Sequence, residues 1–296
     1  MALLRGALET PWVVSERGIL HWEAGPERAR HAAWVAEEGD EVVGWAFAEL
    51  RWAVREEGIG ELWAAVARDR RGRGHGGALY EVAKHHLCDI GAQKAQTWTE
   101  AGAGKRFLRA RGFRETRQER ISAVDPRTAD LSRLAELEAV TRAEGFRVIP
   151  LGEALDRPRE LYEVYMAGEI DMPSDFTEDN ISFEEWERET LANPDLDREG
   201  GFVVLAGERP VSIALLEVDR DGMRATNEMT ATLPEFRRRS LARLAKLLSI
   251  RWAADAGVTS ILTSNDRENP GMLALNDELG YRPLATRVIF GRNLTD

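Results

Sequence analysis

The stretch RRGRGHGGAL (70–79) holds four glycines and three arginines immediately before a run with helical spacing. A helix start offers free backbone N–H groups and the positive end of the helix dipole, and both favour anions. Glycines let the backbone approach a phosphate closely because they lack a Cβ. Arg71 and Arg73 can add charge-assisted hydrogen bonds. The stretch therefore predicts a phosphate-binding loop between a strand and a helix.

The same glycines also fit a different kind of loop. Gly72, Gly74 and Gly77 have the GxGxxG spacing of a dinucleotide-binding turn, and Glu100 follows where a ribose-binding acid would lie. In that turn the first glycine comes directly after the strand. Here the strand is expected to end near Val66, well before the first glycine. A nucleotide-dependent oxidoreductase is therefore the less favoured alternative.

A second copy of this arrangement occurs later in the chain. Two apolar hairpin segments, 33–50 and 201–218, align at an offset of 168, and two strand–loop–helix segments, 61–87 and 227–253, align at an offset of 166. The second loop, RRRSLARL (237–244), keeps an arginine and the helix start but none of the three glycines. One order of elements repeated in this way predicts two similar folded domains.

The break between the two copies is expected at VDPRTAD, where Pro126 disfavours regular structure. We predict an α+β (mixed α/β) fold with domains at 1–124 and 125–296, each a mostly antiparallel mixed sheet flanked by helices. The segment FRVIPL (146–151) reads as the first strand of the second domain. The first domain lacks its counterpart, because the chain opens in what reads as a helix, LLRGALETPWVV (3–14).

Composition excludes several classes of protein. A net charge of -11, without a long basic block, argues against nucleic-acid binding. The chain has no apolar run of the ~18 residues that a membrane span needs, and its first residues are too short and charged for a signal peptide, so we expect a cytoplasmic protein. Cys88, the single cysteine, is expected to be an inert, buried thiol. We expect no metal site, and a monomer or homodimer.

The order of hairpin, strand, Arg-x-x-Gly-x-Gly loop, helix, strand, helix and Gly-aromatic corner resembles the GNAT superfamily of N-acyltransferases. Because it occurs twice, the chain resembles a tandem-GNAT protein over nearly its whole length. Arg71, Gly74 and Gly76 fill the loop motif. The resemblance implies that acetyl-CoA is the co-substrate, that the loop binds its pyrophosphate, and that the pantetheine arm lies between two strands that splay apart.

The resemblance also implies which residues contact the cofactor. In the first loop they are Arg71, Gly72, Arg73, Gly74, His75 and Gly76, and in the second Arg237, Arg238, Arg239, Ser240, Leu241 and Ala242. Asn269 occupies the place of an asparagine that contacts the pantetheine arm in the family. Because the first loop keeps its glycines, we expect the cofactor at Arg71–Gly76. The alternative for either loop is a structural relic without a ligand.

Acyl transfer to an amine needs a base, because a lysine-like amine has a pKa near ~10.4. Glu228 is the best candidate, since the family often takes a carboxylate from this strand, where Thr230 shares its face. Glu61 is the nearest carboxylate in the first copy, displaced by one residue and so expected on the opposite face. The alternative for both is an ordinary solvated glutamate. Leu108 and Asn276 stand where the family has a tyrosine acid.

The acidic insert GEIDMPSDFTEDNISFEEWERE (168–189) is a candidate wall for a cationic substrate, with Asp171 as its representative, or else a solvated acidic loop. The resemblance implies an N-acetyltransferase that moves an acetyl group from acetyl-CoA to the amine of a small molecule by direct attack. The main alternative is a degenerate tandem-GNAT protein that binds acyl-CoA or a partner without turnover.

Overall fold

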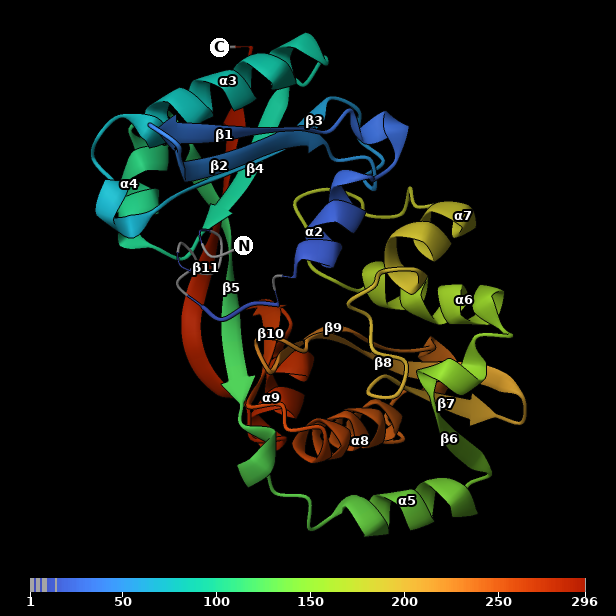
Figure 1. Ribbon diagram of the computed structural model, residues 1–296. Helices are drawn as coiled ribbons and strands as arrows, with labels where there is room; N and C mark the ends of the chain where they lie inside the picture. The colour runs from blue at the N-terminus through green and yellow to red at the C-terminus, as the bar shows by residue number, and fades with distance from the viewer. Residues whose placement is uncertain (1–2, 4–5, 7–9, 14, 296) are drawn as a thin grey trace. The chain divides into compact units, whose positions relative to one another are not determined.

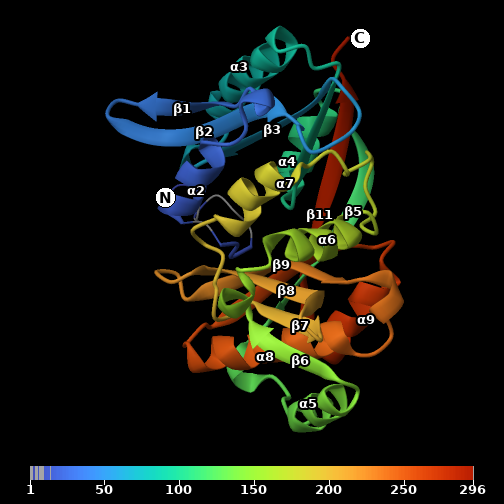
Figure 2. The ribbon, with the colours of Figure 1, turned by 90° about the vertical axis from the view of Figure 1, so that its right-hand side faces the viewer.

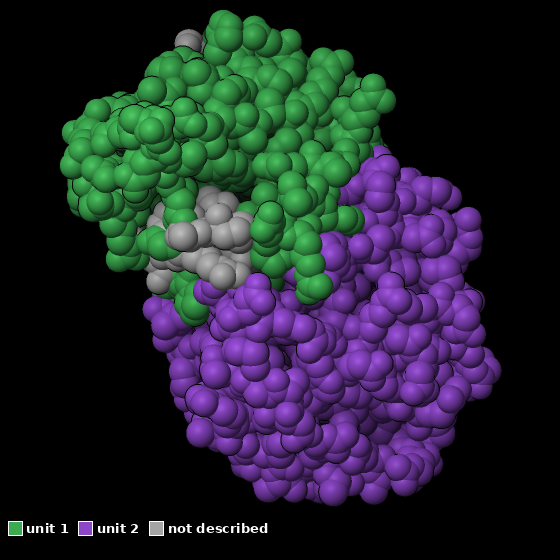
Figure 3. Space-filling view, viewed as in Figure 1, with its two compact units in different colours: residues 1–120, 174–181, 285–296 green, residues 121–173, 182–284 purple. Residues whose placement is uncertain are grey.

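The computed structural model in Figure 1 describes residues 3, 6, 10–13 and 15–295. The chain forms two compact units, coloured in Figure 3. Unit 1 contains residues 1–120, 174–181 and 285–296, and unit 2 contains residues 121–173 and 182–284. None of the described helices has the length and apolar character that would be needed to cross a membrane.

Unit 1 is built on a mixed sheet with the strand order β1-β2-β3-β4-β11. Its strands are β1 (Ala32–Glu38), β2 (Glu41–Leu50), β3 (Ile59–Val66), β4 (Lys94–Thr99) and β11 (Arg282–Asn293). Neighbours are antiparallel except for the parallel pair β3 and β4. The strand that pairs with β4 on its other side is thus the last one in the chain.

Helices cover both faces of this sheet. They are α2 (Glu16–Glu23), α3 (His75–Asp89) and α4 (Gly102–Arg109), with short 3-10 turns at Glu27–Ala29 and Arg68–Arg70. α3 packs on one face of β1, β2 and β3, and α2 lies on the other face (Figures 1 and 2). The core between α3 and the sheet includes Leu62, Leu87 and Phe290, all buried.

Unit 2 repeats the order of the first four strands of unit 1 and adds a strand next to the first of them. Its strand order is β10-β9-β8-β7-β6. The strands are β6 (Phe146–Pro150), β7 (Phe202–Ala206), β8 (Arg209–Asp219), β9 (Arg224–Thr232) and β10 (Ser260–Asp266). β9 and β10 are parallel, and the other pairs are antiparallel. β5 (Arg114–Val124) carries the chain from unit 1 into unit 2.

The helices of unit 2 also lie on two faces. They are α5 (Leu134–Ala143), α6 (Pro158–Glu169), α7 (Phe183–Trp186), α8 (Leu241–Asp255) and α9 (Pro270–Glu278). Short turns lie at Pro126–Thr128, Leu151–Ala154 and Pro234–Phe236, and a π-helical turn at Glu187–Leu191. α6 packs on one face of β8 and β9, and α8 packs on the opposite face (Figures 1 and 2).

The internal repeat is confirmed element by element. β1, β2, β3, α3, β4 and α4 correspond in order to β7, β8, β9, α8, β10 and α9. Among the described residues of unit 1, no strand precedes β1 as β6 precedes β7. Half of the expected first helix, 3–14, lies outside the described residues. The expectation of a buried Cys88 was wrong, because its side chain is on the exposed side of α3.

Unit 2 begins at residue 121, and two further segments depart from a simple division at residue 124. Residues 174–181 lie in unit 1, where Arg55 N donates to Thr177 O at 2.9 Å and Asn180 N donates to Ala53 O at 3.0 Å. Residues 285–296 also lie in unit 1, because β11 pairs with β4 from Val288 to Asn293. Backbone pairing, which sequence order does not reveal, decides both assignments.

We expect Phe290→Ala, near the C-terminus, to destabilise the N-terminal unit. Phe290 is 0% exposed, and a buried Phe→Ala change costs about 3–5 kcal/mol. Hydrogen exchange should then quicken in β3 and β4, far away in sequence. Leu284→Ala is the matched control, since Leu284 lies on the same strand and is 52% exposed. Unchanged exchange in β3 and β4 would contradict the role given to β11.

Candidate functional site

In each unit the two parallel strands pair briefly and then separate. β3 and β4 pair over Ile59–Glu61 and Lys94–Gln96, and β9 and β10 pair over Arg224–Thr226 and Ser260–Leu262. Beyond these three pairs, the side chains of both strands line a cavity. The cavity of unit 1 has a volume of about 460 Å³ and that of unit 2 about 660 Å³. The splayed strands expected from the sequence are therefore present twice.

The two loops that lead into α3 and α8 have the same backbone conformation. Gly72 and Gly74 have φ of 82° and 99°, and their counterparts Arg238 and Ser240 have φ of 62° and 59°. A non-glycine residue in this left-handed region costs about 1–3 kcal/mol and persists only where the surroundings enforce it. The second loop has therefore lost its glycines but kept the shape that glycines would favour.

The leading arginine of each loop is also held in the same way. Arg71 Nε donates to Val66 O at 3.1 Å, and Arg237 Nε donates to Thr232 O at 3.0 Å. In both units the arginine thus folds back onto the end of the preceding strand. The helix that follows begins directly after this loop, and the first N–H groups of a helix have no partner within it.

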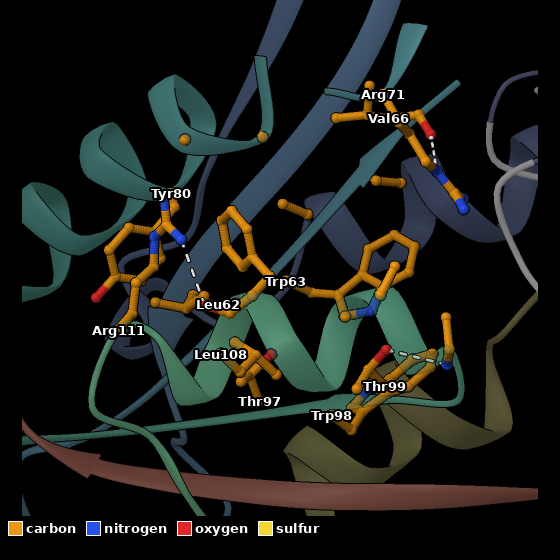
Figure 4. A pocket seen from close by; sticks show the side chains of 18 of the residues that line it. Leu62, Trp63, Val66, Arg71, Tyr80, Thr97, Trp98, Thr99, Leu108 and Arg111 are labelled. Carbon is orange, nitrogen blue, oxygen red and sulfur yellow. Dashed lines mark hydrogen bonds between the residues drawn. The ribbon is translucent and has the colours of Figure 1, made fainter. Parts of the chain in front are cut away.

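The unit 1 cavity takes in part of the first loop. Arg71, Gly72, Gly74 and Gly76 line it. Figure 4 shows Arg71 at this cavity, with its hydrogen bond to Val66. The other two candidates face Glu38 instead. His75 Nε2 donates to Glu38 Oε1 at 2.7 Å, and Arg73 Nη1 lies 3.1 Å from Glu38 Oε2. These contacts, the His75 hydrogen bond above all, lower the pKa of Glu38.

The walls of the unit 1 cavity are mostly apolar. In Figure 4, Trp63 and Trp98 come from the two splayed strands, and their rings stack with centroids 5.4 Å apart. Leu108 also lines the cavity, at the place where the family has its tyrosine acid. Glu100 lines it too, but it accepts hydrogen bonds from Thr10 and Trp12 at 2.8 and 2.9 Å. Its carboxylate is therefore already engaged.

Glu61 lies outside the lining of the unit 1 cavity, which begins one residue later, at Leu62. Leu62 packs against α3, so the adjacent Glu61 lies on the face of the sheet away from α3. Glu228 contacts Tyr165 of α6 on the corresponding face of unit 2, away from α8. The expected opposite-face position of Glu61 was therefore wrong, because a bulge in β9 shifts the alternation of side chains there. Burial raises the pKa of Glu61 to about 7, and Arg51, 3.9 Å away, opposes that rise. Glu61 thus faces charged groups on the side of the sheet away from α3.

The unit 2 cavity brings together most of the site residues that were predicted in this unit. Its lining includes Glu228, Thr230, Arg237, Arg238, Ser240, Leu241, Ala242 and Asn269. Asn269 caps α9, because its Oδ1 accepts from Met272 N at 3.1 Å. Arg239 is directed elsewhere, with its guanidinium carbon 5.8 Å from the centre of the Phe146 ring. The base candidate and the anion loop thus share one cavity.

Glu228 has a strongly perturbed environment. Its Oε1 accepts from the Tyr165 hydroxyl at 3.1 Å, while its Oε2 is shielded from solvent without a hydrogen-bond partner among the described residues. Burial, with Glu217 and Glu169 nearby, raises the pKa of Glu228 to about 8. The Tyr165 hydroxyl has one proton and also contacts Glu169. One of these two carboxyl groups must therefore be protonated for both contacts to be hydrogen bonds.

A β-bulge in β9 places Glu228. Ala214 pairs with Thr230 and Leu216 pairs with Asn227, so two residues of β9 lie opposite one of β8. The β2–β3 pairing of unit 1 runs from Gly44 to Leu50 with no such irregularity. The bulge is therefore specific to unit 2 at this position.

Asn227 and Lys246 stabilise the bulge through hydrogen bonds on the side of the sheet that faces α8. Asn227 Nδ2 donates to Leu215 O at 2.8 Å and to Met229 O at 3.4 Å. Lys246 Nζ donates to Asn227 Oδ1 and fixes the orientation of that amide. Sequence reasoning missed both residues, as well as Tyr165. The available signal was a single lysine in a helix whose other side chains are mostly apolar.

The acidic insert does not form one free wall. Asp171 lines the unit 2 cavity but forms an ion pair with Arg237. In unit 1, Glu178 pairs with Arg51 and Asp175 lies 3.5 Å from Arg117. These carboxylates are matched by arginines, so the expected acidic wall is largely neutralised.

Comparison with known proteins agrees with this geometry. Residues 29–115 match the sequence profile of the acetyltransferase (GNAT) domain. This segment is a GNAT domain. A search of curated protein sequences gave no match.

Solved structures extend the GNAT fold to the whole chain. A tandem GNAT protein from the clavulanic acid biosynthesis pathway matches with a TM-score of 0.72 and 16% identity, over 99% of this chain and 92% of that one. A GCN5-related N-acetyltransferase from Sphaerobacter thermophilus matches with a TM-score of 0.69 and 18% identity, over 99% and 90%. At these identities the likeness shows the fold, which is that of a tandem GNAT protein.

We expect Glu228→Gln to change how stability depends on pH. The folded pKa of about 8 lies above the ordinary 4.5, so the folded state favours the protonated form, and that stabilisation is lost as pH rises from about 4.5 to about 8. The Gln variant lacks this titration and should gain stability relative to the native protein between pH 5 and pH 9. Urea unfolding across this range measures the difference.

The exposed Glu144→Gln, also in unit 2, controls for the loss of a surface charge. A constant difference between native protein and Glu228→Gln at all pH values would show that Glu228 titrates normally.

Proposed function

We propose that unit 2 transfers an acyl group, acetyl in the simplest case, from acyl-CoA to the amine of a small molecule, with Glu228 as the general base. The observation that carries this proposal is that Glu228 and the loop at Arg237–Ala242 line one cavity between splayed strands. A base and an anion-binding helix start are the two features that direct acyl transfer from CoA requires.

The residues around the unit 2 cavity suit the parts of acyl-CoA. The loop, with Arg238 free of ion pairs among the described residues, suits the pyrophosphate. The space between β9 and β10 suits the pantetheine arm. The bulge in β9 leaves backbone without a regular ladder partner, and a backbone N–H is the kind of donor that stabilises a developing oxyanion. When bound, acyl-CoA would supply the activated thioester.

The raised pKa of Glu228 suits removal of a proton from an ammonium group. Transfer from an amine of pKa near ~10.4 to a carboxylate of pKa about 8 is uphill by about 3 kcal/mol, against about 8 kcal/mol for an ordinary glutamate. Bringing a cation next to Glu228 would also relieve the repulsion from Glu217 and Glu169. The burial that makes Glu228 costly to ionise thus makes it a better base for an amine.

Unit 1 supports a different role. It keeps the glycines of the loop and a cavity, so we propose that Arg71–Gly76 binds the same cofactor. Its cavity has no free carboxylate comparable to Glu228 among the described residues, because Leu62, which aligns with Glu228, is apolar and Glu100 is engaged by Thr10 and Trp12. We therefore propose binding without turnover in unit 1. A chain in which both units bind acyl-CoA without turnover is the second candidate function.

Calorimetric titration with CoA tests both sites. A glutamate at either helix start should repel the phosphates, so Gly74→Glu and Ser240→Glu should each remove one site, and the double variant should bind no CoA. Arg109→Glu, an exposed change of the same sign at the end of α4, is the control. Full binding by the double variant would overturn the assignment of both loops.

Glu228→Gln should lower kcat/KM for an amine substrate by about 10²–10⁴-fold and leave CoA affinity unchanged. In the native protein, kcat/KM should rise with pH and level off near pH 8, because the base must be deprotonated. Release of the CoA thiol across a panel of primary amines provides the assay. Unaltered turnover by Glu228→Gln would place the base elsewhere, and no turnover of any amine would favour the second candidate.

A further inference from the structure

Lys246 is an unusual residue in this chain. The sequence has four lysines among 40 basic residues, at positions 84, 94, 105 and 246. Lys246 is therefore the single lysine of unit 2, and it is 2% exposed on α8. Lysine is almost never fully buried unless an opposite charge pairs with it. Lys246 nevertheless lines the unit 2 cavity.

The surroundings of Lys246 leave its amine poorly stabilised as a cation. Its Nζ donates to Asn227 Oδ1 and lies 4.9 Å from the centre of the Tyr281 ring. Among the residues that the structure describes, no carboxylate forms an ion pair with it. Burial lowers the pKa of Lys246 to about 7. Near neutral pH, much of this amine is uncharged, whereas an ordinary lysine is about 0.04% uncharged.

An uncharged lysine amine has two N–H bonds and one lone pair. The hydrogen bond to Asn227 uses one N–H and leaves the lone pair unengaged. The cavity that Lys246 lines is the one that also holds Glu228 and the loop at Arg237–Ala242. A nucleophilic amine therefore lies in the wall of the space to which the proposed function assigns a thioester.

We propose that Lys246 is a site of self-acylation by acyl-CoA bound in unit 2, an inference that rests on the proposed function. The lone pair of Nζ attacks the thioester carbonyl carbon, the C–N bond forms, and the C–S bond breaks. The nitrogen loses one proton and the leaving sulfur gains one, so the products are an N-acyl-lysine and the free CoA thiol. No further reactant is needed.

The product is an amide, which is stable, and so acylated Lys246 is a modified form of the protein rather than an intermediate. Its acyl group occupies part of the cavity, and the modified nitrogen can still donate one N–H to Asn227. Self-acylation therefore keeps the support of the bulge and reduces the space for a further CoA. We expect the modified protein to bind CoA in unit 2 more weakly.

Incubation of the full chain with acetyl-CoA, followed by intact-mass measurement and peptide mapping, tests the proposal. We expect one acetyl group at Lys246, added at least about tenfold faster than at Lys84, Lys94 or Lys105, because the neutral fraction is larger and the site concentrates the thioester. Excess free CoA should slow labelling at Lys246 and leave the other three lysines unaffected.

Lys246→Arg should abolish the fast labelling, while Lys105→Arg, a lysine of α4 in unit 1, should leave it unchanged. Equal labelling of all four lysines, or an unmodified Lys246 in protein that binds CoA by calorimetry, would overturn the proposal and leave the proposed function standing. Absence of CoA binding would overturn both. Because the native protein alone gives the decisive map, the result does not depend on the folding of a variant.

Discussion

The separation of β9 from β10 after three residue pairs is the constraint on which the chemistry of unit 2 depends. Parallel strands in a closed sheet would satisfy one another's backbone groups and leave no space between them. Here the two strands part, and the gap is lined by Glu228, Lys246 and the loop before α8. The polar groups in that gap are costly to bury without partners. The unit is thus folded around a space that a polar ligand would complete.

The two units show how one plan can be preserved by different means. The first loop reaches its left-handed positions with glycines, and the second reaches the same positions with Arg238 and Ser240. The first unit has regular pairing between β2 and β3, whereas the second has a bulge that sets Glu228 and is held by Asn227. The two loops have therefore kept one backbone conformation with different residues, whereas the strands before them differ in both pairing and side chains.

Much of the fold could be predicted because it is repeated. The hairpins, the strand–loop–helix segments and the order of elements depend on local spacing, and two copies reinforce each other. The tandem GNAT fold was predicted on the same grounds. Glu228 was predicted as the base from the resemblance to the GNAT family, and it lines one cavity with the second loop. Simple strand alternation does not hold there, because the bulge lies between Asn227 and Thr230 and those two side chains contact each other.

Other features could not be predicted because they depend on contacts between distant segments. Asp175 and Glu178 read as an open acidic wall, yet they meet Arg117 and Arg51. The importance of Lys246 follows from its burial against Asn227 and Tyr281, which helical spacing does not reveal. The loop glycines led to the prediction that the cofactor binds in unit 1. The bulge that distinguishes unit 2 could not be predicted, because no residue pattern in β9 indicates it.

The pairing of β11 with β4 also has a consequence for biosynthesis. Domains commonly fold as they leave the ribosome, starting from the N-terminus. Unit 1 cannot complete its folding at that stage, because β11, which places Phe290 in its core, is synthesised after unit 2. Its sheet edge at β4 stays unpaired during that interval, and open edges invite aggregation. A nascent chain of this protein therefore has its greatest need for chaperones in the half that was made first.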